Sequence, residues 1–308
     1  MSPTSPSALN AERERMKGIG FGLAAYSMWG CFPLFFSLFS GTPAFEILTQ
    51  RIIWSCLFLS SLVIATRRWH PVLKALGNPR QLVRVALCAL LIGLNWWLYI
   101  WSVEHHEVLQ ASLGYFMTPL VNVMLGILVL KERMTRLQAV ALALAIVGIL
   151  IQLIRLGELP WISLALASSF GCYGLFRKQV PLDGLTGLLV ETLLLLPLAL
   201  LSLGWLYARH ASHFGEQWQI SALLIASGIL TALPLLAFAG AAKRLTLTTV
   251  GFLMYINPTL QLVFALTVFH ERLLPIQLVT FCFIWASLAL YSAASWQRRP
   301  NRRRSVQA

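Results

Sequence analysis

Long stretches of apolar residues alternate with short polar segments along the chain. Each stretch has close to the about 20 residues that an α-helix needs to cross the hydrocarbon of a bilayer. The stretches lack the alternating pattern of barrel strands, and a helix satisfies its own backbone hydrogen bonds within lipid. The pattern predicts an all-α integral membrane protein with ten transmembrane helices. They cover residues 18–39, 44–66, 82–103, 107–130, 136–154, 159–176, 184–206, 218–241, 246–269 and 274–294.

The composition agrees with a membrane protein. Hydrophobic residues make up 58% of the chain and charged residues 11%, whereas about a quarter of a soluble chain is charged. The net charge of +13 would suit nucleic acid, but the basic residues lie in the short segments between apolar runs. The five cysteines lie inside apolar runs without metal-ligand spacing. We therefore expect a lipid bilayer as the partner, no nucleic acid, and no disulfide or metal site.

The distribution of Lys and Arg predicts the orientation, because cytoplasmic loops of membrane proteins carry an excess of them. With the N-terminus in the cytoplasm, the inner segments hold twenty Lys and Arg residues and the outer loops three. Both termini are therefore predicted to be cytoplasmic. We expect a disordered tail over residues 1–16 and a basic tail over residues 297–308.

The chain also contains an internal repeat. Residues 118–138 align without a gap with residues 257–277, since both have proline at the second position and a Glu-Arg pair near the end. Each copy contains an odd number of predicted helices, five, so the second copy must enter the membrane from the opposite side. The pattern predicts two inverted repeats, over residues 17–155 and 156–296, an arrangement typical of secondary transporters with a site near the bilayer midplane.

Polar side chains recur at helical spacing on one face of the repeated helices. A polar face is costly against lipid, so these faces should look toward each other or toward a water-filled cavity. The alternative is that they hydrogen-bond neighbouring helices together. Pro119 and Pro258 predict a kink at the same depth in each half. The residues are Tyr115, Thr118 and Asn122 in the first repeat and their copies Met254, Asn257 and Gln261 in the second, beside which Tyr255 is a further candidate for the cavity.

Aromatic and amide side chains on three further helices extend this prediction. Together they indicate an aromatic, mostly uncharged cavity suited to a small organic solute. Aromatic residues of membrane helices also serve in packing and in interfacial belts, which is the alternative for each of them. The residues are Tyr26, Trp29, Asn95, Tyr99 and Tyr173.

Two charged residues lie deep inside predicted helices. Arg51 is about 10 Å from the outer end of its helix, at 1.5 Å per residue, and Glu191 is equally deep from the inner side. An isolated charge at such depth costs at least ~2.5–3.5 kcal/mol. In a structural interpretation Glu46 holds Arg51, which extends toward the surface. In a functional one Arg51 attracts an anion or gates the pathway, and Glu191 exchanges a proton.

The segment Glu104-His105-His106-Glu107 contains metal-ligand residue types, but it occupies one short turn without a further ligand nearby. We predict a solvated turn and no metal. The chain also lacks nucleotide-binding, nucleophile-elbow and zincin motifs. The sequence therefore predicts no cofactor and no enzyme activity.

Several short motifs are spread over about residues 17–296. They are Lys17-Gly18 followed by Tyr26, Trp29-Gly30 and Pro33; Glu46 to Arg51; Asn95-Trp96; Glu104 to Gln110 followed by Gly114-Tyr115; and Asn257-Pro258 followed by His270-Glu271-Arg272. With these motifs the chain resembles the EamA-type permeases of the drug/metabolite transporter superfamily. The resemblance implies a central cavity lined by the first, third, fourth, sixth, eighth and ninth helices. It places the fifth and tenth at the periphery, where contacts of a homodimer would form.

Two hypotheses of function follow. The first is a secondary transporter of the bacterial inner membrane that moves a small organic metabolite or drug by alternating access. Because an ATP-binding motif is missing, any active transport would have to use an ion or solute gradient. The second is a membrane-embedded enzyme or sensor, which would need two or more acid–base residues at one depth. Only Arg51 and Glu191 lie well inside predicted helices. A solute-sized cavity reaching one face would favour transport.

Overall fold

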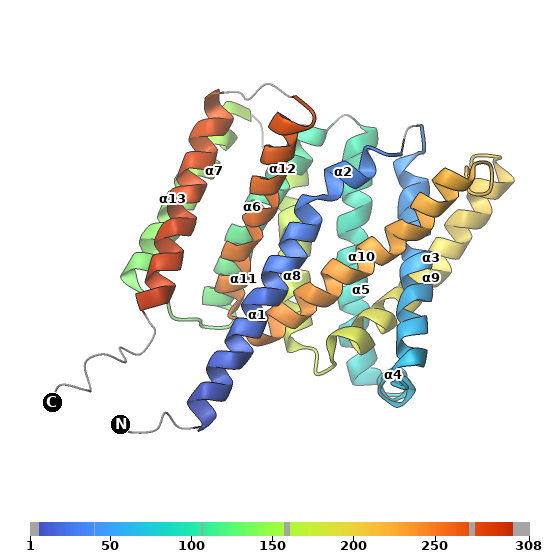
Figure 1. Cartoon of the computed structure of the whole chain (residues 1–308), viewed down its shortest axis with the longest axis horizontal. Helices are drawn as coiled ribbons and strands as arrows, with labels where there is room; N and C mark the ends of the chain where they lie inside the picture. The colour runs from blue at the N-terminus through green and yellow to red at the C-terminus, as the bar shows by residue number, and fades with distance from the viewer. Residues whose placement is uncertain (1–5, 40, 106, 157–160, 271–274, 298–308) are drawn as a thin grey trace.

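The computed structural model describes residues 6–39, 41–105, 107–156, 161–270 and 275–297, and the regular structure in these ranges is helical (Figure 1). Thirteen helices are present in this part of the chain. They are α1 (Pro6–Gly30), α2 (Phe32–Phe36), α3 (Ala44–Ala65), α4 (Trp69–Leu76), α5 (Pro79–Glu104), α6 (Val108–Leu128), α7 (Arg136–Leu156), α8 (Trp161–Gln179), α9 (Gly184–Ala208), α10 (Trp218–Arg244), α11 (Leu247–Met254), α12 (Ile256–Thr267) and α13 (Pro275–Gln297).

Six helical segments in the described ranges are long and apolar enough to cross a membrane, and three shorter apolar segments accompany them. The protein is therefore a multi-pass helical membrane protein. The six are Asn10–Phe36, Ala44–Ala65, Pro79–Ser102, Gly184–Ala208, Trp218–Arg244 and Leu247–Thr267, and the shorter ones are Leu113–Leu128, Arg136–Ile151 and Leu278–Ala294.

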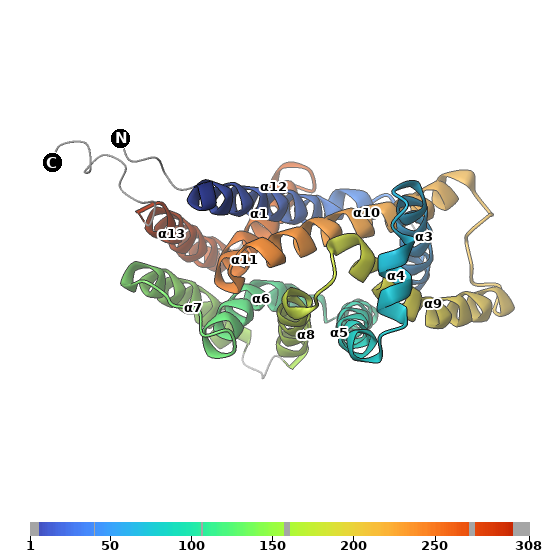
Figure 2. The same cartoon turned by 90° about the horizontal axis from the view of Figure 1, so that it is seen from below.

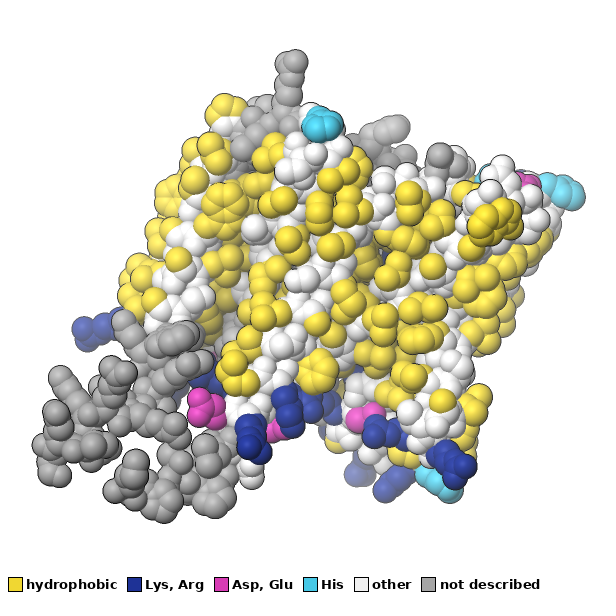
Figure 3. All heavy atoms as spheres, in the orientation of Figure 1, with side chains coloured by type: hydrophobic (Ala, Val, Ile, Leu, Met, Phe, Trp, Pro, Cys, Tyr) yellow, Lys and Arg dark blue, Asp and Glu magenta, His cyan; other side chains and the backbone are white. Residues whose placement is uncertain are grey.

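The helices form an elongated bundle, best seen from below in Figure 2. Helices α7 and α13 pack together at one end, and α3 and α9 pack together at the other. Between these pairs, α1, α10, α11 and α12 form one row and α5, α6 and α8 the other. Helix α1 begins and α13 ends at the same edge of the bundle (Figure 1), and Lys and Arg side chains gather along this edge on the face shown in Figure 3.

Glycines allow the closest helix contacts. At Gly228 in α10, an added Cβ would lie 2.6 Å from the backbone nitrogen of Ser55 in α3, and at Gly251 in α11 it would lie 2.8 Å from the carbonyl oxygen of Pro119 in α6. Small residues at such crossings are typical of helix packing in lipid, because close backbone approach maximises van der Waals contact.

The N-terminal segment differs from the prediction. Residues 6–16 belong to α1 rather than to a disordered tail; residues 1–5 and the C-terminal segment 298–308 lie outside the described residues. Ala, Leu, Glu and Arg in this segment favour a helix. Glu14 also lies at the protein surface 2.6 Å from Lys17 and 2.9 Å from Arg244 of α10.

Proline interrupts two of the predicted helices. The predicted span over residues 18–39 is divided at Cys31 into α1 and α2, because Pro33 at the start of α2 lacks a backbone donor. The repeated prolines differ from each other. Helix α6 continues through Pro119, whereas the corresponding helix is divided at Tyr255 into α11 and α12, with Pro258 in the first turn of α12.

One short helix lies in a segment for which the apolar pattern predicted only a basic loop. Helix α4 buries Val72 and Ala75, and it packs against α5 and α9. Its two buried positions are three residues apart, as one face of a short amphipathic helix requires.

Candidate functional site

A cavity of about 740 Å³ is lined by residues from both rows of helices. This volume falls within the range of about 300–1,000 Å³ that is usual for small-molecule sites. The cavity extends to Ser37, directly after α2, and to Phe269, after α12, so that it reaches one end of these helices. Its other lining residues come from α1, α2, α3, α5, α6, α8, α10, α11, α12 and α13.

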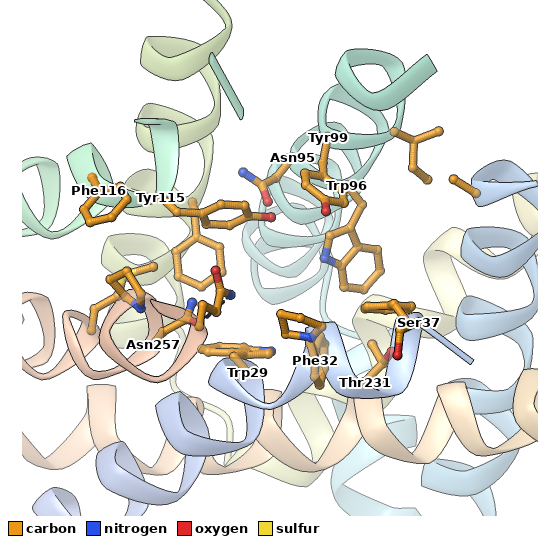
Figure 4. Close-up of a pocket in the computed structure, with 18 of the residues that line it drawn as sticks. Trp29, Phe32, Ser37, Asn95, Trp96, Tyr99, Tyr115, Phe116, Thr231 and Asn257 are labelled. Carbon is orange, nitrogen blue, oxygen red and sulfur yellow. Dashed lines mark hydrogen bonds between the residues drawn. The ribbon is translucent and has the colours of Figure 1, made fainter. Parts of the chain in front are cut away.

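Seven of the residues singled out in the sequence line this cavity. Their side chains approach it from both rows: in Figure 4, Tyr99 of α5 and Tyr115 of α6 lie across from Trp29 of α1 and Asn257 of α12. The two tyrosine rings meet edge to face with their centroids 5.8 Å apart. The seven residues are Trp29, Arg51, Asn95, Tyr99, Tyr115, Asn257 and Gln261.

The amide side chains of the cavity are partly held by the protein. Asn95 Nδ2 donates to the carbonyl oxygen of Leu166 at 2.9 Å and to Ser169 Oγ at 3.0 Å, which joins α5 to α8. Gln261 Nε2 donates to Asn257 Oδ1 at 2.8 Å, one turn earlier in α12. These bonds fix the orientation of both amides at the cavity wall.

The other polar-stripe residues are buried in helix packing outside the residues that line the cavity. Thr118 Oγ1 donates to the carbonyl oxygen of Gly114 at 2.8 Å, which is a bond within α6. Asn122 lies 3.9 Å from the sulfur of Met254, across the contact of α6 with α11. Tyr255 is buried between α11 and its neighbours. Asn122 therefore fits the alternative in which polar side chains bond neighbouring helices, whereas the bond of Thr118 stays within its own helix and Tyr255 packs in an apolar cluster.

Packed aromatic rings lie at the inner limit of the cavity. Trp29 and Phe170, which both line it, meet edge to face with centroids 5.7 Å apart. Behind them Phe238 contacts Trp29 at 5.9 Å and stacks on Tyr173 at 5.8 Å, and Tyr26 contacts Trp29 at 5.6 Å. Tyr26 and Tyr173 therefore lie behind the lining of the cavity and are not part of it. We call the five rings of Tyr26, Trp29, Phe170, Tyr173 and Phe238 the aromatic plug.

Arg51 lies in the cavity wall, and the suggested partner Glu46 does not hold it. Its Nε donates to Thr231 Oγ1 of α10 at 2.7 Å, and its Cζ lies 5.4–5.9 Å from the ring centroids of Phe32, Phe36 and Trp96. Five residues along a helix correspond to a rotation of about 140°, so Glu46 and Arg51 point to different faces. The structural interpretation based on this pair is wrong.

Glu46 instead binds the segment between α9 and α10. Its Oε1 accepts from Ser212 Oγ and from the backbone nitrogen of His213, each at 2.8 Å, and its Oε2 lies 2.8 Å from His213 Nδ1. The carboxyl group thus ties the start of α3 to this loop and is outside the cavity lining.

Glu191 has a charged partner, Arg177, which lies just beyond the predicted helix over residues 159–176. Arg177 Nη1 lies 3.5 Å from Glu191 Oε1, with the two side chains 0% and 1% exposed. Tyr173 donates to Glu191 Oε2 at 3.1 Å, and Arg177 Nη2 donates to the carbonyl oxygens of Asp183 and Gly184. Arg177 follows the end of an apolar run. The sequence around it does not show whether its side chain points into the bundle or toward the cytoplasm.

The segment Glu104–Glu107 is only partly described. His105 stacks on Trp101 with the ring centroids 4.1 Å apart, and its Nδ1 lies 2.9 Å from the Trp101 carbonyl oxygen. In the described residues, the structure brings together no group of three His, Cys, Asp or Glu side chains that would hold a metal ion.

A multi-pass helical bundle that encloses a solute-sized, aromatic and amide-lined cavity belongs to the class of membrane proteins that bind small molecules between their helices. The model of the "EamA-like transporter family" matches residues 16–154. "Protein RarD" of Salmonella typhimurium is 45% identical over 91% of this chain and 95% of its own. An "Uncharacterized transporter" of Vibrio cholerae is 43% identical over 91% of this chain and 93% of its own.

The chain belongs to the EamA-like transporter family, in its RarD group. A solved structure described as "Crystal structure of protein" has the same fold, with a TM-score of 0.69 over 92% of this chain and 99% of that one, at 15% identity. The likeness to this structure concerns the fold alone.

Proposed function

We propose that the protein is a secondary transporter of the bacterial inner membrane, which moves a small organic metabolite or drug by alternating access. In this proposal ten transmembrane helices form two inverted repeats, over residues 17–155 and 156–296, with both termini in the cytoplasm. The observation that carries it is the cavity, because it reaches one end of the helices and is bounded at its inner limit by packed aromatic rings. A cavity bounded in this way is what one state of an alternating-access cycle requires.

The helix contacts support the inverted repeat. Each helix of the first half has a copy in the second half. The corresponding helices are α1 and α8, α3 and α9, α5 and α10, α6 and the pair α11 and α12, and α7 and α13. Exchanging each helix with its copy converts the contact of α6 with α8 into that of α12 with α1, and the contact of α3 with α10 into that of α9 with α5; all four contacts are present. The pairs α3 with α9, α6 with α11, and α7 with α13 map onto themselves and are also in contact.

The aromatic plug supports the same arrangement. Trp29 and Phe170 occupy equivalent positions of the two repeats, 141 residues apart, and their rings touch. Residues that contact their own copies mark the pseudo-twofold axis between inverted halves. A rocking motion about this contact would open one end of the bundle while it closes the other.

The alternative is a membrane-embedded enzyme or sensor. Catalysis would require acid–base groups that converge on the cavity, but Arg51 is the single charged side chain among the described lining residues. The buried pair of Arg177 and Glu191 contributes no residue to the lining.

The test is flux across vesicles that contain the purified protein. Uptake and efflux are measured for a panel of metabolites and antibiotics, with and without a pH gradient, against vesicles lacking the protein. Flux that requires the protein supports transport. Binding of a panel member without flux in either direction contradicts transport and favours the sensor.

Orientation has a separate test in whole cells. On a cysteine-free background, Ser37→Cys and Thr246→Cys each place a thiol at an exposed position, the first at the cavity mouth and the second between α10 and α11. A membrane-impermeant maleimide should label Ser37→Cys in intact cells and Thr246→Cys only after lysis. The reverse pattern contradicts cytoplasmic termini.

A further inference from the structure

We propose that the cavity binds an organic anion, with a carboxylate on the Arg51 guanidinium and an apolar or aromatic body against the surrounding rings. The proposal rests on the proposed function and names the substrate class of the same cavity. It begins with an unbalanced charge. Within the described ranges Arg51 has one hydrogen-bond partner, Thr231, and no carboxylate of the protein lies in a salt bridge with it.

The guanidinium is held in one orientation. Thr231 Oγ1 donates to the carbonyl oxygen of Ser227 at 2.7 Å and accepts from Arg51 Nε at 2.7 Å, so both roles of this hydroxyl are used. With Nε bound to α10, the outer edge of the guanidinium keeps its Nη1 and Nη2 donors for another acceptor. Two parallel N–H groups on one edge match the two oxygens of a carboxylate.

Aromatic rings surround the guanidinium on several sides. The ring centroids of Phe32 and Phe36 in α2 and of Trp96 in α5 lie within 5.9 Å of its central carbon. The faces of these rings attract the cation, but they accept no strong hydrogen bond from it. These rings leave the positive charge in an apolar wall. A cation inside a membrane protein is normally offset by an opposite charge or by a water-filled space.

The remaining wall suits the body of such an anion. Tyr99 and Tyr115 present their rings and hydroxyl groups to the cavity, and Trp29 and Asn257 face them from the other row (Figure 4). A cation in the cavity would meet the like charge of Arg51, and a neutral amide would offer one acceptor atom where a carboxylate offers two with a full charge. The cavity should therefore select anions over neutral and cationic molecules of the same shape.

Three probes of similar shape test this selection: phenylacetate, phenylacetamide and benzylamine. Their binding to the full-length protein in detergent is measured at pH 7.4 by quenching of tryptophan fluorescence, since Trp29 and Trp96 line the cavity. We expect phenylacetate to bind at least about tenfold more tightly than phenylacetamide, as is usual when a hydrogen bond to a charged group is lost. Benzylamine should bind more weakly still.

Two matched variants assign the selection to Arg51. Arg51→Gln should remove the preference for phenylacetate, while Arg209→Gln should retain it. Arg209 is the control because it also lies over an aromatic ring, Trp205 at 5.6 Å, but on an exposed part of the protein outside the cavity. If Arg51→Gln does not fold, the affinities of the three probes for the unaltered protein still show whether the cavity prefers the anion. Absent binding of phenylacetate, equal affinity for the amide, or a preference that survives Arg51→Gln overturns the proposal.

Flux of the same probes separates this proposal from the proposed function. Arg51-dependent binding of phenylacetate without flux in vesicles would support the anion site and contradict transport. Flux of phenylacetamide or benzylamine without any preference for phenylacetate would support transport and overturn the anion site.

Discussion

The buried pair of Arg177 and Glu191 makes a quantitative prediction about stability. We expect Glu191→Gln and Arg177→Met each to destabilise the protein strongly, because either change leaves one buried charge without its opposite. Gln at position 191 keeps an acceptor for Tyr173, and Met at position 177 keeps much of the volume of the Arg stem. Both changes therefore remove the charge with little loss of packing.

The distance in the structure sets the magnitude. Two unit charges 3.5 Å apart attract each other by about 5 kcal/mol at an effective dielectric constant of ~20. Removal of one member of a buried ion pair typically costs about 3–5 kcal/mol. Since both charges have already lost their hydration, removing them together should cost much less. The double variant Glu191→Gln/Arg177→Met is expected to be more stable than either single variant, with a coupling energy of at least about 2 kcal/mol.

The assay is reversible unfolding in mixed micelles of dodecyl maltoside and sodium dodecyl sulfate, followed by tryptophan fluorescence. Glu14→Gln is the matched control, because it removes a carboxylate whose ion pairs with Lys17 and Arg244 are largely exposed. This variant should unfold at the same detergent fraction as the unaltered protein. Single variants that lose less than about 1 kcal/mol, or losses that simply add in the double variant, would refute the reasoning.

Three further predictions follow from the structure. Gly228→Ala should destabilise the protein by about 1–3 kcal/mol in the same assay, because its Cβ would overlap the backbone of α3. The control Gly204→Ala in α9 has open space around the new Cβ and should stabilise the protein by up to about 1 kcal/mol. Equal effects of the two variants would contradict the close crossing of α3 and α10. Asn257→Ala should lower flux at unchanged folded yield, because Asn257 lines the cavity. Thr118→Val should keep flux and change stability by less than about 1 kcal/mol, because it removes only a bond to a carbonyl of the same helix. The opposite order of the two effects on flux would place the cavity elsewhere. If Glu191 is the proton-exchanging group, flux by folded Glu191→Gln protein should no longer depend on pH, and an unchanged pH profile would exclude that role.

The order of residues along the chain determined which segments are helical and apolar. A long run of apolar residues has one stable solution in lipid, a helix, so the membrane class followed directly from the pattern. Spacing within a helix was equally informative: Tyr115, Asn257 and Gln261 were selected by helical spacing, and all three line the cavity. The same spacing also selected Thr118 and Asn122, which are buried outside the residues that line the cavity, because periodicity defines a face and not what lies opposite it.

Only the tertiary structure decided the partners of the buried charges. Arg51 binds Thr231, 180 positions away in the chain, and Glu46 binds the loop that contains His213, 167 positions away. Arg177 turns inward to Glu191 although its place beside Lys178 is typical of a cytoplasmic anchor. The physical reason is that helical spacing relates only residues on the same helix. A buried charge is stabilised by a group on another helix, and the packing of the helices determines which group lies near it.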